Sequence, residues 1–101
     1  MNPRRPLVNA SLSAEEIHSR LEPLPGWDVE RLEIVKTYVF TTYLGGIDFV
    51  NSVAKEAERM NHHPMIVVGW RRVTVRLTTH SAGGITELDL RLAEFCESQA
   101  R

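Results

Sequence analysis

The sequence predicts an α+β fold, a four-stranded antiparallel sheet with three helices packed on one face. The apolar pattern switches between the helical and strand periods in the order helix, two strands, helix, two strands, helix. Short connections join the strands of each pair, as in antiparallel neighbours. In α+β domains, the helices gather on one face of an antiparallel sheet, so we expect all three helices on the same face here.

Composition limits the class of protein. The chain has 101 residues, of which 43% are hydrophobic and 25% charged, as in an ordinary globular domain. We expect a flexible lead-in over residues 1–10 and a single domain over residues 11–101. A net charge of -1 provides no basic field for nucleic acid, and no apolar run could span a membrane. The single Cys96 excludes an internal disulfide, and without a signal peptide we expect a cytoplasmic protein.

The first elements follow from a cap and from strand alternation. Ser13 and Glu16 form a capping box that predicts a short helix, ended by two nearby prolines. Residues 26–30 alternate as a strand, and we expect Trp27 and Val29 on one side of it.

The next predicted strand, over residues 33–41, is apolar on both faces. Ile34 and Tyr38 share one face, and Val35 and Val39 share the other. A strand of this kind is covered on both sides, so we expect a second protomer over the outer face.

A long helix is predicted after the break at Gly45 and Gly46, with apolar positions near the 3.6-residue period. Pro64 disfavours helical backbone at the residue before it, so the helix is expected to end near His62.

The last predicted elements are a hairpin and a helix. Residues 65–68 and 72–79 are expected as strands that turn around residues 69–71, with the alternating apolar side chains of the second strand facing inward. Thr86 is expected to cap the final helix, which carries Cys96 in its apolar stripe.

Three histidines and two carboxylates form a candidate catalytic cluster. Glu58 and His62 are four residues apart, so on a helix they share a face and the carboxylate can orient the imidazole. His63 and His80 fall at element ends, where side chains line clefts. Asp89, early in the last helix, either joins the cluster or only complements the helix dipole.

Other kinds of site fit less well. Histidines with carboxylates can bind zinc or iron, but no spacing places two imidazoles on one helical face. Cys96 lies in an apolar stripe, where a buried thiol is inert. Metal-free acid–base catalysis remains, because histidine titrates near neutral pH. The three histidines, Glu58 and Asp89 of the candidate cluster can also each be an ordinary solvated surface residue.

Seven residues have a distinctive spacing: Glu58, His62, His63, Pro64, Trp70, His80 and Asp89. They lie in or between the segments EAERMNHHP, LTTH and GGITELDLRLAEF. By this spacing and these segments, the chain resembles the pterin-4a-carbinolamine dehydratases from Ser11 onward. The resemblance implies the fold predicted above, assembly into homodimers or homotetramers, and loss of water from 4a-hydroxytetrahydrobiopterin to give quinonoid dihydrobiopterin.

The resemblance also implies roles for individual residues. His62 and His80 match the general acids, His63 the residue that mainly holds the substrate, and Glu58 the residue that orients the imidazoles. The further substrate contacts expected are Asn61, Thr78, Thr79, Ser81, Trp70 and Asp89. Trp70 could be a pocket wall or only a core aromatic. Neither a metal nor a cofactor is implied.

Three positions depart from the pattern. Relatives often have aspartate at Asn61, an aromatic at Ile66 and cysteine at Ser81. We expect Ile66 to weaken binding, because it removes a ring that could stack on the pterin. The resemblance implies that the substrate is the spent pterin cofactor of aromatic amino acid hydroxylases, which the dehydratase helps to recycle. It implies no direct nucleic acid or membrane partner. An alternative is a non-catalytic transcription coactivator or assembly protein on the same scaffold.

Overall fold

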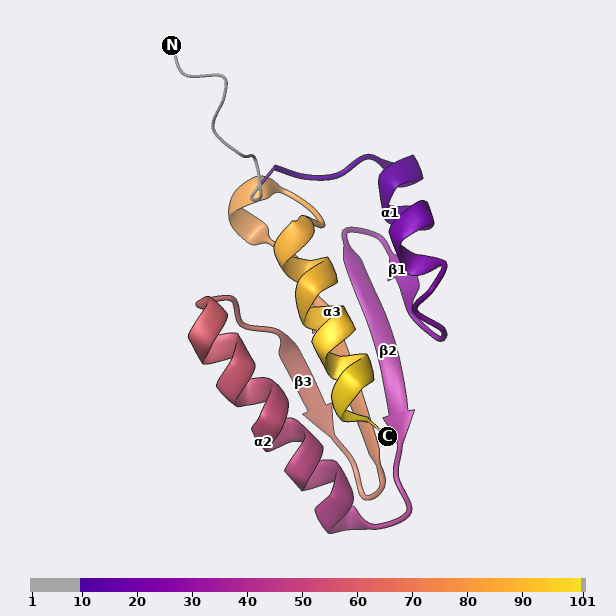
Figure 1. Cartoon of the computed structure of the whole chain (residues 1–101), viewed down its shortest axis with the longest axis vertical. Helices are drawn as coiled ribbons and strands as arrows, with labels where there is room; N and C mark the ends of the chain where they lie inside the picture. Colours follow the sequence, from indigo (N-terminus) through magenta and orange to yellow (C-terminus); the bar gives the residue numbers. More distant parts are fainter. Residues whose placement is uncertain (1–9, 101) are drawn as a thin grey trace.

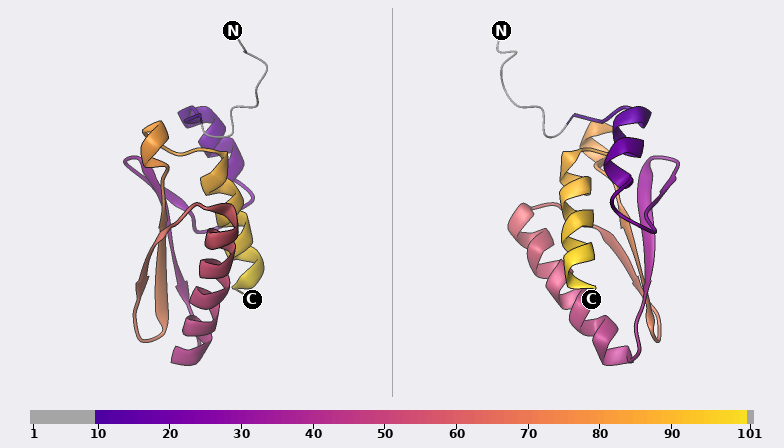
Figure 2. Two further views of the ribbon diagram at one scale, coloured as in Figure 1. Left: turned by 90° about the vertical axis from the view of Figure 1, so that its left-hand side faces the viewer. Right: turned by 45° about the vertical axis from the view of Figure 1, so that its right-hand side comes forward.

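The computed structural model describes residues 10–100, so the predicted lead-in lies almost entirely outside the described residues. A sheet forms one layer and three helices cover one of its faces, as predicted (Figures 1 and 2). The elements are α1 (Ala14–Leu21), β1 (Asp28–Glu30), β2 (Glu33–Val39), α2 (Tyr43–Met60), β3 (Met65–Val68), β4 (Arg72–Leu77), the 3-10 helix η1 (His80–Ala82) and α3 (Glu87–Gln99). Within the described residues, no helix is long and apolar enough to cross a membrane.

The sheet has the strand order β1-β2-β4-β3, and every pairing is antiparallel. β4 is therefore a central strand, and its inward-facing Val73, Val75 and Leu77 are fully buried as predicted. Because β3 and β4 form a hairpin, the start of β3 and the end of β4 lie at the same end of the sheet. This arrangement brings the segment of His62 and His63 near the segment of Thr79 and His80.

The core lies between the sheet and the helices α2 and α3. Val53 of α2 and Leu92, Ala93 and Cys96 of α3 are all fully buried. Burial raises the pKa of the Cys96 thiol to about 12. The thiol is therefore protonated at neutral pH, which agrees with the inert role predicted for it.

The start of α2 differs from the prediction. The helix begins at Tyr43, and the Thr42 side chain caps it by accepting from the Gly45 amide. The two glycines therefore lie inside the first turn rather than before the helix. A Cβ atom on Gly46 would meet Val73 Cγ2 at 3.3 Å, so this glycine permits close approach of helix and sheet.

The first two strands also differ in detail. The predicted strand over residues 26–30 begins only at Asp28, so the buried Trp27 directly precedes β1. Val29 within β1 is half exposed, and both side chains line the same groove, described below. Gly26, with φ of +86°, forms the turn that precedes Trp27. On the outer face of β2, Val35 is already buried within this chain, and Val39 is exposed.

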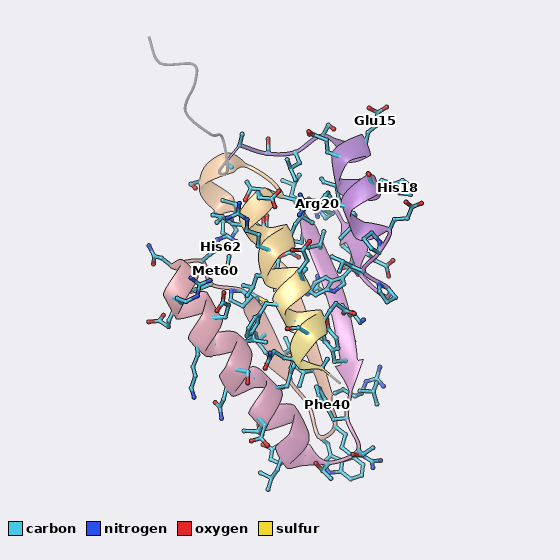
Figure 3. All side chains as sticks on the ribbon, in the orientation of Figure 1. Glu15, His18, Arg20, Phe40, Met60 and His62 are labelled. Atoms are coloured by element: carbon cyan, nitrogen blue, oxygen red, sulfur yellow. The ribbon has the colours of Figure 1, made fainter. Side chains whose placement is uncertain are left out.

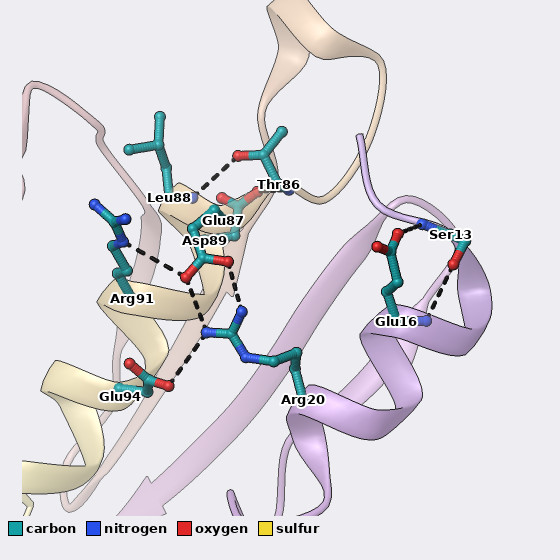
Figure 4. A network of polar contacts seen from close by, with 9 residues as sticks. All are labelled: Ser13, Glu16, Arg20, Thr86, Glu87, Leu88, Asp89, Arg91 and Glu94. Carbon is teal, nitrogen blue, oxygen red and sulfur yellow. Dashed lines mark hydrogen bonds and ion pairs between the residues drawn. The ribbon is translucent and has the colours of Figure 1, made fainter. Parts of the chain in front are cut away.

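Charged residues join α1 to α3 (Figure 4). Both guanidinium nitrogens of Arg20 donate to the carboxylate of Glu87, at 2.5 and 2.9 Å, and one also reaches Glu94 at 3.4 Å. This hydrogen bonding holds the pKa of Glu87 below its usual range and raises that of Arg20. The short first helix is thereby fixed beside the start of α3.

Candidate active site

The backbone at the end of α2 separates the two adjacent histidines. Asn61 has left-handed backbone angles, with φ of 52° and ψ of 43°, and forms the C-cap of the helix. The His62 amide then donates to the Ala57 carbonyl at 3.0 Å. The change of direction predicted at Pro64 therefore occurs at Asn61, and asparagine is among the few residue types that adopt this conformation readily.

His62 is buried and pairs with Asp89. Its Nε2 lies 2.5 Å from Asp89 Oδ1, and the carboxylate is fully buried at the third position of α3. Figure 3 shows His62 just beyond the end of α2, beside the first turns of α3. Asp89 was expected either to join the histidine cluster or to act only at the helix N-terminus. It does both, because it contacts His62 and completes the capping box of α3.

Two further polar residues surround Asp89. Its Oδ2 accepts from the Thr79 hydroxyl at 2.8 Å and from the Thr86 amide at 2.9 Å. The hydroxyls of Thr79 and Thr86 are 2.9 Å apart. Thr86 was predicted only as a cap. The T-x-x-D spacing was the one signal in the sequence that could have linked it to Asp89.

Glu58 pairs with His63 rather than with His62, which corrects the predicted pairing. Its Oε2 contacts His63 Nε2, and both side chains are largely exposed. The helix ends at Met60, so the i,i+4 geometry that would join Glu58 to His62 does not extend that far. A solvent-exposed contact of this kind contributes little to stability.

His80 and Ser81 begin η1 and are both exposed. His80 directly follows Thr79, whose hydroxyl contacts Asp89, so the backbone connects His80 to the buried cluster. Thr78 is partly buried and its hydroxyl donates to the Leu32 carbonyl at 2.6 Å.

Two predicted substrate contacts need revision. Asp89 is fully buried and Thr79 is 6% exposed, with its hydroxyl engaged inside the protein. Neither side chain is exposed enough in this chain to touch a substrate, and each is engaged inside the protein, Thr79 with Asp89 and Asp89 with His62.

Trp70 does not line the histidine site within this chain, nor is it a core aromatic. It is 71% exposed at the turn between β3 and β4, stacked on Arg71 at 4.1 Å from guanidinium carbon to ring centroid. This turn is at the end of the hairpin opposite His62 and His63. Four residues lie between Met65 and Trp70, and β3 alone spans about 10 Å of that separation.

A large groove lies elsewhere in the described part of the chain. It has a volume of about 750 Å³ and runs between α1, the β1–β2 turn and residues 83–85. Trp27, Leu32 and Ile85 are among its lining residues, and none of the predicted site residues is. The groove and the polar cluster around His62 are therefore two separate features of the chain.

Within residues 10–100, no three His, Cys, Asp or Glu side chains are grouped so that they could hold a metal ion. Each of the two adjacent histidines is instead paired with its own carboxylate. Such pairs can orient an imidazole and transfer a proton.

Comparison with known proteins agrees with these features. The family model described as pterin 4 alpha carbinolamine dehydratase matches residues 10–99. A protein of Mycobacteroides abscessus, provisionally named a pterin-4-alpha-carbinolamine dehydratase, is 44% identical over 90 residues, covering 89% of this chain and 96% of its own. One of Natronomonas pharaonis with the same provisional name is 47% identical, covering 82% and 88%.

Solved structures show the same fold. A Brucella melitensis protein described as a transcriptional coactivator/pterin dehydratase superposes with a TM-score of 0.87 at 31% identity, covering 90% of this chain and 99% of its own. A pterin dehydratase-like protein, described as a RuBisCO assembly factor in the alpha-carboxysome, has a TM-score of 0.61 at 21% identity, covering 73% and 86%. This second likeness concerns the fold alone. From the family match and these identities, the chain belongs to the pterin 4 alpha carbinolamine dehydratase family.

Proposed function

We propose that this protein dehydrates 4a-hydroxytetrahydrobiopterin to quinonoid dihydrobiopterin by histidine acid–base catalysis. The observation that carries the proposal is the buried pair of His62 and Asp89 beside the segment of His80. Membership of the dehydratase family supplies the substrate class.

The reaction requires a proton on the departing oxygen at the 4a carbon and the loss of another proton from the pterin ring. Hydroxide leaves the 4a carbon poorly, so a protonated imidazole donates to that oxygen while the carbon–oxygen bond breaks and water departs. A base then accepts a proton from the pterin ring. Well-placed groups of this kind contribute about 10²–10⁴-fold in rate.

The geometry suggests which residues take these roles. His62 is held by Asp89 and has the fixed orientation that a proton donor needs. His80 is the second proton-transfer group and is exposed to an arriving substrate. His63, exposed and paired with Glu58, suits contact with the substrate. Asn61 and Ser81 are exposed near these histidines and are the remaining candidates for substrate binding.

A dehydratase assay tests the proposal. The purified protein, freed of metal with a chelator, should accelerate decay of 4a-hydroxytetrahydrobiopterin above the spontaneous rate. The double variant His62→Ala/His80→Ala is the control and should not. No acceleration by the wild type, or activity that returns only with added zinc, would refute the proposed mechanism.

The alternative function is a non-catalytic interaction protein. Either function is compatible with an oligomer, and exposed apolar residues on the sheet favour one. Met65 and Val67 of β3 and Val39 of β2 are exposed on the face opposite the helices. We propose that a second copy of this chain covers them in a homodimer or homotetramer. Light scattering should give an oligomer at micromolar concentration. A monomer would contradict this assignment, and the dehydratase assay separates an enzyme from a coactivator or assembly protein.

A further inference from the structure

The hydroxyls of Thr79 and Thr86 can donate in only one direction. A hydroxyl has a single proton, and Thr79 donates its proton to Asp89 Oδ2 at 2.8 Å. At the 2.9 Å contact between the two hydroxyls, Thr79 must therefore accept and Thr86 must donate. The Thr86 oxygen in turn accepts from the Leu88 amide at 3.2 Å, as Figure 4 shows. The proton of each hydroxyl in this buried chain therefore points toward Asp89.

The donors around Asp89 determine what it can offer His62. Oδ2 receives both the Thr79 hydroxyl and the Thr86 amide, so it acts as an acceptor only. An aspartate side chain in its usual carboxylate form has no proton to give, so at the 2.5 Å contact it is His62 Nε2 that donates to Oδ1.

The other ring nitrogen of His62 is then the one available for chemistry. A neutral imidazole carries one proton, and here that proton is on Nε2. Within residues 10–100 Nδ1 has no recorded hydrogen-bond partner, and no buried side-chain nitrogen or oxygen lacks one. Nδ1 therefore keeps contact with the molecular surface.

We propose that Thr86, Thr79 and Asp89 form a positioning relay that fixes the proton of neutral His62 on Nε2, so that proton exchange with the substrate occurs at Nδ1. Thr86 and Asp89 are fully buried, so they are positioning residues that act through the histidine. The catalytic consequence of the relay rests on the proposed dehydratase function. The proton position itself does not.

Nuclear magnetic resonance of protein labelled with ¹⁵N-histidine tests the proton position directly. The pH is raised until the ring shifts of His62 stop changing, and two-bond ¹H–¹⁵N correlations then report which nitrogen carries the proton. His62→Gln assigns the signals by their disappearance. We expect the Nε2–H pattern in the wild type. A pattern with the proton on Nδ1 would overturn the inference.

Asp89→Asn provides the sharpest variant. The Thr79 hydroxyl and the Thr86 amide still require an acceptor, so the amide oxygen of the new side chain should face them. Its NH₂ group then faces Nε2 of His62, which must accept, and the proton moves to Nδ1. We expect the pattern to invert and kcat to fall with little change in KM. The loss can reach about 10⁴-fold when the wrong tautomer is imposed on a catalytic histidine.

Variants at Thr86 separate positioning from a purely structural role. Thr86→Ser retains the hydroxyl and should preserve both the spectrum and kcat. Thr86→Val removes the donor to Thr79 and should lower kcat per folded molecule while leaving KM nearly unchanged. Equal kcat in the two variants, or an Asp89→Asn spectrum like that of the wild type, would overturn the relay.

The outcomes also separate this inference from the proposed function. A wild type without dehydratase activity, but with the Nε2–H pattern and its inversion in Asp89→Asn, would refute the function and support the relay. An active wild type with the His62 proton on Nδ1 would support the proposed function and refute the relay.

Discussion

His62 and His63 are adjacent in the chain, yet their imidazole rings occupy opposite environments. The His62 side chain is 10% exposed and pairs with a carboxylate that is fully buried, whereas the His63 side chain is 55% exposed and pairs with one that is 77% exposed. A hydrogen-bonded pair that is shielded from water holds its geometry more strictly than one in solvent. The two histidines should therefore contribute differently to catalysis.

We predict that His62→Ala and His80→Ala each lower kcat by about 10²–10⁴-fold, the range for loss of a general acid. His63→Ala should mainly raise KM, because His63 is exposed and suited to contact with substrate. Steady-state kinetics measure both quantities, and circular dichroism confirms that each variant is folded. Loss of turnover in His63→Ala alone, with the other two silent, would reverse the assigned roles.

The carboxylate partners offer a matched comparison. Glu58→Gln removes an exposed partner of His63, and we expect only a small change in kcat because solvent screens this pair. A loss in Glu58→Gln as large as that in His62→Ala would show that the exposed pair carries the chemistry.

A second prediction concerns Asn61, whose left-handed backbone ends α2. Glycine adopts this conformation without penalty, so Asn61→Gly should leave stability unchanged or raise it by up to about 1 kcal/mol. Asn61→Ala should lower stability by about 1 kcal/mol, because alanine is strained there. Urea unfolding measures both changes.

The same pair of variants tests whether the Asn61 side chain contacts substrate. Both remove the amide, so a higher KM in both would indicate a contact with the pterin. A normal KM in Asn61→Gly would leave this residue with a backbone role only. Lower stability in Asn61→Gly would contradict the conformational argument itself.

The sequence was sufficient for the fold because its signals are local. The alternation of Val73, Val75 and Leu77 and the caps at Ser13 and Thr86 each predict an element without knowledge of its partners. Gly46 misled the prediction of the helix start, because its role depends on the approach of a strand that is distant in sequence.

The site was less predictable because its contacts join distant segments. Helical spacing assigned Glu58 to His62, but the true partner is Asp89, 27 residues later, and no periodicity connects them. The hydroxyl contacts among Thr79, Thr86 and Asp89 likewise depend on how the end of β4 meets the start of α3. Residue types and spacing could nominate the cluster but could not pair its members.

The third prediction concerns Trp70, which lies far from the histidines in the single chain. Trp70→Ala should leave kcat and KM unchanged and lower stability by no more than about 1 kcal/mol, the contribution of an exposed cation–π contact with Arg71. Val68→Ala, in the adjoining strand end, is a control for local packing. A raised KM in Trp70→Ala with a normal melting temperature would refute the prediction, and would show that a partner copy brings this ring to the site.

The last prediction concerns Glu97 on α3, which anchors the helix to the sheet. One of its carboxylate oxygens accepts from Trp27 Nε1 at 3.2 Å, from Lys36 Nζ at 2.7 Å and from the Tyr38 hydroxyl. Burial alone would raise the pKa of Glu97, but the hydrogen bonds from Lys36 and Tyr38 outweigh it and lower the pKa below the usual value. The ionised form is therefore favoured in the folded protein.

A lowered pKa in the folded state makes stability depend on pH in a definite direction. The stabilisation from Glu97 is fully present above the ordinary glutamate pKa of about 4.3, and is lost as pH falls through the lower folded value. Glu97→Gln keeps an oxygen acceptor but no charge. It should be about 1.5–3 kcal/mol less stable than the wild type at pH 7, the range for a hydrogen bond to a charged group.

The difference between wild type and Glu97→Gln should shrink as pH falls below about 4.3, because the wild-type carboxylate then becomes protonated and loses the same charge. Urea unfolding at a series of pH values measures it. Glu94→Gln, a more exposed carboxylate on the same helix, is the control and should show a smaller difference at every pH. A Glu97→Gln difference that stays constant from pH 7 to acid would mean that the charge of Glu97 does not stabilise the fold.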